Sequence, residues 1–357
     1  MNDFSFDFDL WLAWREFNFW SLTILGFVSA LIAYINYDFG HQKSTVSLSV
    51  LIMSALVFSL GLFPIEWGYS TDRANYATIF VGFQNGLTLF KDKDYGFILL
   101  TSTLSEFLNV KMYFVVITVI YLFNYLISII KLVGNKSYWL VVTVIMSMAF
   151  TNYAINTMRA GLALSFIVLS FCMYPNKWKM LCCIIIGSAI HTSVVLPSLM
   201  IIISYFYPNT KLFYKLWFLA IPLSFLAGGY FMGLFASMSD DSRTSYLINI
   251  SNSRYNIGFR IDFIIYSLAP IIIGWYYINK CHFVDNLYYL IYNSYILTNI
   301  FWILVIRANY SDRFAYLSWF LIPFVVVYPL LKQDLPIKKN VWLAIILLGE
   351  TMFKLFF

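Results

Sequence analysis

The sequence has few charged residues and few cysteines, and these shortages exclude several classes of protein. Only 11% of its 357 residues are charged, whereas soluble domains have roughly 25%, and no stretch is polar enough for a separate soluble domain. The four cysteines (Cys172, Cys182, Cys183 and Cys281) form neither a disulfide framework nor a metal spacing. The net charge of +6 is ordinary for a membrane protein with lysine-rich inner loops. It does not indicate a nucleic-acid partner.

Common catalytic and targeting motifs are also missing. We find no phosphate-cradling glycine loop, no nucleophile elbow, no zinc spacing and no paired-carboxylate signature. Nothing resembles an ATPase motor, and we expect neither a metal nor another cofactor. The first 16 residues are acidic and aromatic without a basic start, so no cleavable signal peptide is predicted.

Long apolar runs are what the sequence has in abundance. Hydrophobic residues make up 61% of the chain, and runs of about 17 to 25 residues recur, the length that a helix needs to cross a bilayer. We predict an all-α polytopic membrane protein with about 10–12 transmembrane helices, forming one integral membrane domain over residues 1–357. The predicted spans are 19–37, 46–65, 113–130, 138–153, 161–174, 181–205, 213–235, 263–278, 287–306, 314–331 and 341–353.

Lysines give the predicted orientation, because cytoplasmic loops are enriched in positive charge. The segment KQDLPIKK at 332–339 is the strongest inside signal, and alternation from it puts two larger loops outside, at approximately 66–112 and 236–260. The alternation also requires residues 180–207 to have both ends inside. We therefore predict a broken or re-entrant segment near 187–193, with His191 at the break; such breaks are tolerated where they line a cavity. The alternative is one plain helix with lysines on the wrong side.

The arginines follow the opposite pattern. Eleven of the fifteen lysines fall inside, yet all eight arginines fall at or beyond the outer ends of spans. An anion bound at the outer face would explain this, because the guanidinium fork matches phosphate oxygens in a bidentate way. Arg159 and His191 stand in long apolar sequence, where ionisable groups usually face a polar cavity or a partner.

Each candidate residue also has a structural alternative. His191 could be a hydrogen-bonded core residue, and Arg159, Arg260 and Arg313 could be interfacial side chains that reach out of the membrane. Asp72 could be a helix N-cap. Five further acidic residues are expected to be structural or solvated: Asp262 and Asp312 pair with adjacent arginines, and Asp94, Glu66 and Glu106 are solvated.

Several outer-face motifs occur in a definite order along the chain. They are STDRANYATIF followed by KDYGFILLTSTL, then NTMRAGLALSFIVLS, GSAIHTSVVLPSLM, NIGFRIDFIIYSLAP and NYSDRFAYLSWFLIPF, from about residue 68 to residue 325. In this order they resemble the EpsG/Wzy family of bacterial polysaccharide polymerases. The family often has an EPGF-like pattern where this chain reads KDYGF. The role of that glutamate does not transfer, and Asp94 is at best a substitute.

The resemblance implies glycosyl transfer between undecaprenyl-diphosphate-linked oligosaccharides at the periplasmic face of the bacterial cytoplasmic (inner) membrane, without a metal. A chain-length regulator and a flippase of the same pathway would be partners, beside the lipid bilayer. In this mechanism Arg159, Arg260 and Arg313 bind the diphosphate, with Arg254 and Arg307 as auxiliaries. His191 is the candidate general base, and Asp72 is the alternative base or a sugar ligand. The rival functions are a lipid-linked oligosaccharide flippase and a membrane O-acyltransferase acting on surface glycans.

Cysteine accessibility tests the predicted orientation. A cysteine at Asn252 should react with an impermeant thiol reagent in whole cells once the outer membrane is made permeable, because this loop is predicted to lie outside. A cysteine at Gln333 should react only after lysis. The reverse pattern would overturn the orientation and, with it, the argument from the arginines.

Overall fold

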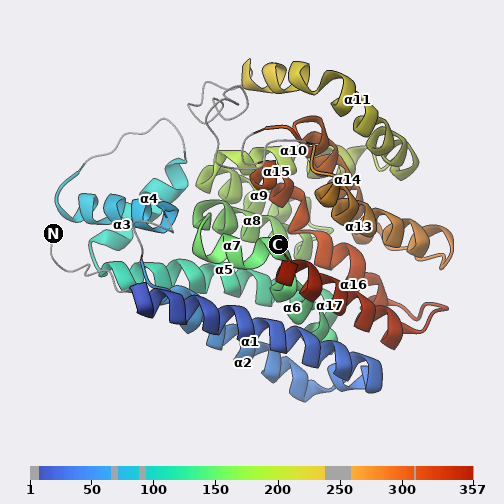
Figure 1. The fold of residues 1–357 in the computed structure, drawn as a ribbon, viewed down its shortest axis with the longest axis horizontal. Helices are drawn as coiled ribbons and strands as arrows, with labels where there is room; N and C mark the ends of the chain where they lie inside the picture. The colour runs from blue at the N-terminus through green and yellow to red at the C-terminus, as the bar shows by residue number, and fades with distance from the viewer. Residues whose placement is uncertain (1–7, 66–70, 88–93, 238–258, 309–310, 357) are drawn as a thin grey trace. The chain divides into compact units, whose positions relative to one another are not determined.

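The protein is helical in the part that the structure describes (Figure 1). This computed structural model describes residues 8–65, 71–87, 94–237, 259–308 and 311–356, and no β-strand occurs within those ranges. The predicted all-α multi-pass membrane fold is confirmed, whereas the count of about 10–12 spans stays a prediction. The segments that are long and apolar enough to cross a membrane are Asp9–Ile35, Val110–Met146, Thr210–Leu234, Ile261–Asn279 and Ser311–Lys332.

The described helices fall into two compact units, residues 1–195 with 330–357 and residues 196–329. This division into two units does not test the expectation of a single integral membrane domain, which stays a prediction. The first unit contains α1 (Phe8–Ile35), α2 (Lys43–Gly61), α3 (Thr71–Gln84), α4 (Tyr95–Ser105), α5 (Val110–Val133), α6 (Ser137–Met146), α7 (Met148–Ile155), α8 (Met158–Cys172), α9 (Lys177–Ile190) and α17 (Lys339–Phe356).

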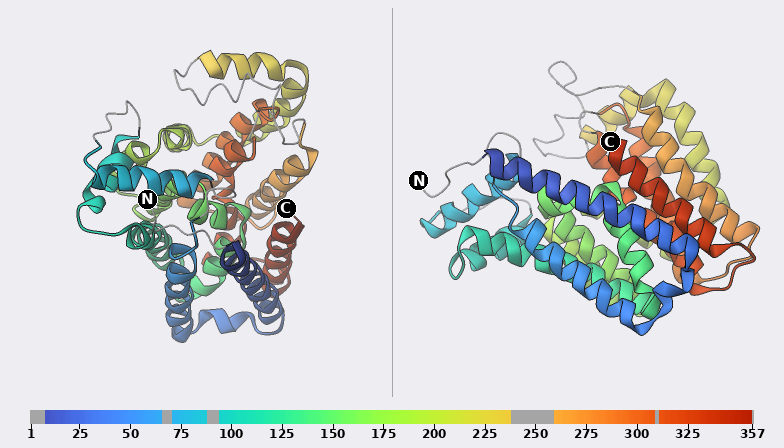
Figure 2. Two further views of the ribbon diagram at one scale, coloured as in Figure 1. Left: turned by 60° about the vertical axis from the view of Figure 1, so that its left-hand side comes forward. Right: turned by 60° about the horizontal axis from the view of Figure 1, so that its bottom comes forward.

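Apolar packing arranges the first unit around α6, whose residues are all buried. A helix that is hydrophobic on every side belongs in a core rather than at a surface. Around it, α1 runs along α17, and α5 packs between α2 and α8, as Figure 2 allows the reader to follow. The consecutive helices α8 and α9 pack against each other.

In α2 and in the α8–α9 hairpin, a lysine and an arginine lie at opposite ends. Lys43 begins α2, and the carbonyl of Gly61 at the other end of α2 accepts a hydrogen bond from Arg73. Arg159 lies at the start of α8, and Lys177 begins α9 after the turn that follows α8. This separation is what the predicted orientation requires, while the assignment of the arginine end to the outer face stays a prediction.

The predicted break at His191 is confirmed. The helix α9 ends at Ile190, and His191 has an extended backbone with φ −149° and ψ 123°. A short 3-10 turn (Thr192–Val194) follows, and α10 (Val195–Phe206) begins after it. The break exposes backbone groups that an unbroken helix would satisfy, and one of them, the Thr192 N–H, becomes part of the site described below.

The second unit contains α11 (Thr210–Ser237), α13 (Ile261–Asn279), α14 (Asn286–Leu304), α15 (Ser311–Trp319) and most of α10 and α16 (Ile322–Lys332). Its core holds a polar network around Asn299. The Asn299 Nδ2 donates to the hydroxyls of Ser267 and Ser318 at 3.1 and 2.9 Å, and its Oδ1 accepts from Trp217 Nε1 at 2.8 Å. These bonds link α14 to α13, α15 and α11, because polar side chains between apolar helices must find partners in one another.

Tyrosine hydroxyls in the second unit satisfy carbonyls next to a proline. Pro329 lies within α16 and has no N–H to offer the carbonyl of Val325, four residues earlier. Tyr288 donates its hydroxyl to that carbonyl at 3.0 Å, and Tyr277 donates to the carbonyl of Val326 at 2.9 Å. The proline is thus accommodated without leaving the Val325 carbonyl unpaired in an apolar interior.

Candidate functional site

The helical hairpin of α8 and α9 brings the two residues of interest to one end of the first unit. Arg159 lies in the first turn of α8 and His191 follows the last residue of α9. The two helices approach closely at Gly187, where an added Cβ would lie 2.8 Å from the carbonyl oxygen of Ala163. A side chain at position 187 would push the helices apart, so the glycine maintains the spacing at this end of the hairpin.

Asp94 joins this end from a different part of the chain. It precedes α4 and has a left-handed backbone, with φ 61° and ψ 37°, a conformation that aspartate adopts more readily than most residues. Two residues later, a Cβ on Gly96 would lie only 2.9 Å from the backbone carbon of Ala189 in α9. The missing side chain lets the start of α4 press against the end of α9, which places the Asp94 carboxylate beside His191.

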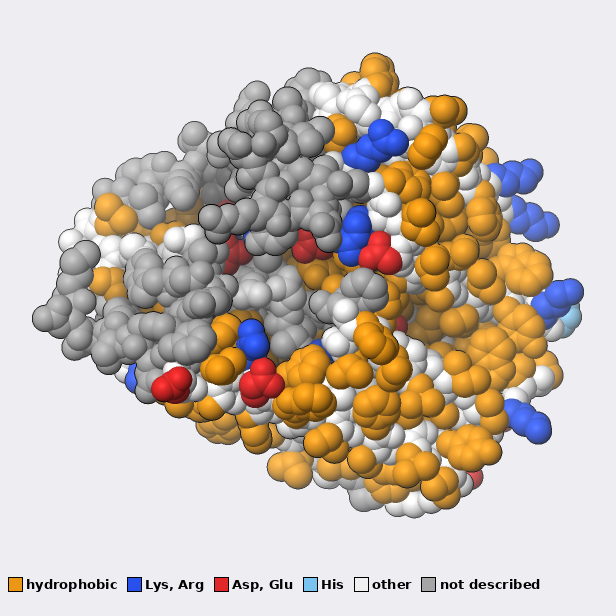
Figure 3. Space-filling model, viewed as in Figure 1, with side chains coloured by type: hydrophobic (Ala, Val, Ile, Leu, Met, Phe, Trp, Pro, Cys, Tyr) orange, Lys and Arg blue, Asp and Glu red, His pale blue; other side chains and the backbone are white. Residues whose placement is uncertain are grey.

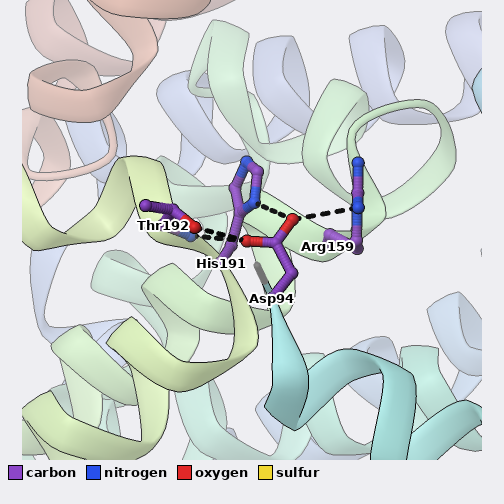
Figure 4. A network of polar contacts seen from close by, with 4 residues as sticks. All are labelled: Asp94, Arg159, His191 and Thr192. Carbon is purple, nitrogen blue, oxygen red and sulfur yellow. Dashed lines mark hydrogen bonds and ion pairs between the residues drawn. The ribbon is translucent and has the colours of Figure 1, made fainter. Parts of the chain in front are cut away.

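The Asp94 carboxylate is bound on both oxygens (Figure 4). Its Oδ2 accepts from Arg159 Nη1 at 3.0 Å and lies 3.2 Å from His191 Nδ1. Its Oδ1 accepts from the backbone N–H and from the hydroxyl of Thr192, both at 2.8 Å. Only 2% of the Asp94 side chain is exposed. The expectation that Asp94 is solvated is therefore wrong, because these four donors replace the water that the carboxylate loses.

The charge of this buried carboxylate is maintained by its neighbours. Burial alone would raise the pKa of Asp94, but the hydrogen bond and charge of His191 and the two hydrogen bonds from Thr192 outweigh it. The net result is a pKa well below the usual range of an aspartate. Asp94 is thus an anion at neutral pH, and as an anion it can only accept hydrogen bonds.

The Arg159 side chain is partly exposed to solvent, although Asp94 and two aromatic rings contact its guanidinium. Its side chain is 24% exposed, and its Cζ lies 5.4 Å from the ring centre of Tyr76 and 5.7 Å from that of Phe97. Its Nε is buried without a hydrogen-bond partner in the described part of the chain. Aromatic contacts and one ion pair fix the plane of the guanidinium, which is the preparation that a bidentate anion site needs.

Asp72, the alternative base, lies in the first turn of α3 and is half-buried. A carboxylate in the first turn of a helix is stabilised by the helix dipole. Asp72 also interacts electrostatically with Arg159 and Tyr76. The structure therefore places Asp72 in the same electrostatic neighbourhood as Arg159, and its function as a base or a sugar ligand stays a prediction.

The remaining predicted arginines belong to the second unit. Arg260 contacts Asp262 through both Nε and Nη2, with a shortest distance of 2.6 Å, so the expected pairing of Asp262 is confirmed. Arg313 is exposed, and Asp312 interacts electrostatically with it and with Arg260.

Two auxiliary arginines complete the set. Arg307 Nη2 donates to the carbonyl of Phe225 at 3.1 Å, and Arg254 lies outside the described residues. Glu106 is exposed, as expected for a solvated residue, and Glu66 lies outside the described residues.

Arg73 is a buried arginine to which the sequence analysis gave no function. Its guanidinium donates to the carbonyls of Leu60 and Gly61 at 3.3 and 2.6 Å, and its Cζ lies 4.1 Å from the ring centre of Phe114. The last carbonyls of a helix have no partner within the helix, so Arg73 caps the end of α2. The sequence offered no signal for this contact, because Arg73 follows an aspartate in a polar stretch that is typical of a helix start.

The helices and the buried cluster together define a multi-pass helical membrane protein with an ionisable site at one end of its first unit. The EpsG family model matches residues 49–356, and the chain belongs to the EpsG family. The family consists generally of glycosyltransferase-like polymerases, so membership indicates a polysaccharide polymerase type of function. Comparison with curated proteins and with solved structures found no match.

The capping function of Arg73 can be tested by stability. The Arg73→Gln variant should lose about 1–3 kcal/mol of stability, because two carbonyls at the end of α2 lose their charged donor. Thermal unfolding of the purified protein in detergent measures this as a lower midpoint. The matched control is Arg15→Gln, since the Arg15 side chain is 53% exposed and should be nearly neutral. Equal midpoints for the two variants would show that Arg73 is not a structural cap.

Proposed function

We propose that this protein joins lipid-linked oligosaccharide repeats by glycosyl transfer, using the end of the first unit that holds His191 and Arg159 as its catalytic centre. The observation that supports the proposal most strongly is the cluster itself. In a chain of the EpsG family, a histidine and a partly exposed arginine meet at one buried carboxylate. Such a group of ionisable residues beside membrane helices is expected where a protein does chemistry on a polar substrate.

The proposed reaction transfers the growing glycan to an incoming repeat. The hydroxyl oxygen of the incoming repeat attacks C1 at the reducing end of the growing chain. The bond from C1 to the phosphate oxygen breaks, and its electron pair leaves with undecaprenyl diphosphate. The hydroxyl proton passes to His191, whose unperturbed pKa of about 6.5 suits a base at neutral pH. Asp72 is the alternative base.

Arginines would stabilise the charge that develops on the diphosphate. A diphosphate leaves as an anion, so fixed guanidinium groups lower the energy of the transition state without a metal. Arg159 is the first candidate, because its orientation is fixed by Asp94 and by two aromatic rings. From the sequence, Arg260 and Arg313, with Arg254 and Arg307 as auxiliaries, are also proposed to bind diphosphate. Arg260 would have to exchange part of its contact with Asp262 for phosphate.

The setting proposed for this reaction is the periplasmic face of the bacterial inner membrane. The separation of lysine and arginine ends in α2 and in the α8–α9 hairpin supports this, since lysine-rich ends usually face the cytoplasm. A flippase that supplies repeats and a regulator of chain length are the proposed partners in the pathway.

Purified protein with radiolabelled lipid-linked repeats tests the proposed activity directly. A polymerase should convert single repeats into a ladder of longer lipid-linked glycans. Relocation of unchanged repeats across reconstituted vesicles would instead identify a flippase, and esterified repeats would identify an acyltransferase. Either of these two results without a ladder would refute glycosyl transfer.

The Arg159→Lys variant tests the proposed contact with the diphosphate. Lysine keeps the charge but cannot provide two parallel donors to phosphate, so polymer should be lost while the protein remains in the membrane. The length distribution of cell-surface polymer and the protein level measure the two effects. Arg15→Lys, at an exposed arginine, is the control and should behave as wild type. Normal polymer from the Arg159 variant would reduce Arg159 to a structural or interfacial side chain.

The His191→Gln variant tests the proposed base. Glutamine keeps hydrogen bonding but cannot accept the proton, and loss of one general base typically costs about 10²–10⁴-fold in rate. Single repeats on lipid should accumulate, with almost no ladder and with normal protein level. His282→Gln is the control, because His282 is exposed. If His191 is only a core residue, the glutamine variant will make normal polymer, and Asp72 becomes the base to test.

A further inference from the structure

We propose that Asp94 is a positioning residue that acts through His191 and Arg159 and does not itself touch the substrate. The inference rests on the proposed function and assigns Asp94 a part in it. The geometry that supports it is the sharing of one carboxylate oxygen, Oδ2, between His191 Nδ1 at 3.2 Å and Arg159 Nη1 at 3.0 Å. No other side chain in the described residues forms an ion pair with both of these groups.

Asp94 is poorly suited to be the base. Its Oδ1 already accepts two hydrogen bonds from Thr192, and its Oδ2 serves the imidazole and the guanidinium. A carboxylate has about four acceptor positions, and the four donors among the described residues already occupy that many. With its side chain only 2% exposed, Asp94 cannot reach a substrate hydroxyl without losing these partners. Its contribution must therefore pass through the residues that it holds.

The first effect is on the protonation of the imidazole. Because ionised Asp94 only accepts hydrogen bonds, the hydrogen of neutral His191 must sit on Nδ1. The lone pair of the neutral ring is then on Nε2, so Nε2 is the atom that takes a proton from the acceptor sugar. Fixing the tautomer of a base in this way contributes directly to rate, because the other tautomer presents a hydrogen where a lone pair is needed.

The second effect is on the charge balance of the site. The Asp94 anion favours the protonated form of the imidazole 3.2 Å away, whereas the Arg159 cation on the same carboxylate oxygen opposes it. Among the described residues, Tyr76 and Asp72 of α3 also interact electrostatically with Arg159. Removing the Asp94 charge takes away the anion 3.2 Å from His191 Nδ1, so the Asp94→Asn change should lower the pKa of His191.

Nitrogen-15 NMR measures this coupling without any need for activity. The chain has three histidines, so His41→Gln and His282→Gln variants assign the signals of histidine-labelled protein in lipid nanodiscs. In the wild type, neutral His191 should carry its hydrogen on Nδ1. In Asp94→Asn, the pKa of His191 should fall, because the anion that stabilises the protonated ring is gone. Asp334→Asn, at an exposed aspartate, is the matched control and should leave the titration unchanged. Asp94→Glu keeps the charge and should keep the pKa of His191 closer to the wild-type value.

The pH profile of polymerisation then links the coupling to function. A base must be neutral, so activity falls as pH drops below the pKa of His191. Loss of Asp94 lowers that pKa, and the acid limb of the Asp94→Asn profile should move to lower pH by the same amount as the NMR titration. Its maximal rate should fall on the order of 10²-fold. Asp94→Glu should recover part of the rate.

The possible outcomes separate the inference from the proposed function. A His191 titration that is the same in wild type and Asp94→Asn overturns the inference, whatever the activity. A shifted titration with full polymerisation by Asp94→Asn also overturns it, because Asp94 would then control the imidazole without consequence for rate. If the folded wild type makes no polymer at all, the proposed function fails, and the NMR titration still decides whether Asp94 controls His191.

Discussion

The cluster at the end of the first unit depends on one constraint, which is that a buried carboxylate must be paired. The Asp94 side chain is almost completely removed from solvent, and an unpaired charge in that environment would be far too costly. The four donors described above come from two segments, the first turn of α8 and the turn after α9, where the break at His191 leaves the Thr192 N–H open. The broken helix and the ion pair therefore require each other, because the carboxylate needs the donors and the break needs an acceptor.

This mutual requirement favours a site whose groups are held in place before any substrate arrives. Gly96 and Gly187 permit close approach of α4 to α9 and of α9 to α8, and the carboxylate then fixes an imidazole and a guanidinium at one point. Groups that are held in place before reaction need not reorganise when charge develops, which is the main physical advantage that a polar site offers a reaction. A glycosyl transfer with a diphosphate leaving group would use both parts, the imidazole for the proton and the guanidinium for the negative charge.

Much of this arrangement could be predicted from the sequence, for identifiable reasons. Apolar runs marked the helices, and His191 and Arg159 stood out because ionisable groups are rare inside such runs. The break at His191 followed from lysines on both sides of one span. Asp94 was misjudged because it ends the charged run KDKD at 91–94, which is typical of a solvated loop, and because its partners lie 65 and 97 residues away. Local sequence patterns do not predict contacts between residues so far apart in the chain. The capping of α2 by Arg73 was missed for the same reason.

The central claim is that Asp94 and His191 act as one unit, and a double-mutant cycle tests it most directly. Polymerisation rates would be compared for wild type, Asp94→Asn, His191→Gln and the double variant, at equal protein level. If Asp94 works through His191, the Asp94→Asn change should lower the rate little further in a protein that already lacks the base. The double variant should therefore polymerise at nearly the rate of His191→Gln, apart from any loss that passes through Arg159. Fully additive losses in the double variant would contradict the account, because they would mean that the two residues contribute independently.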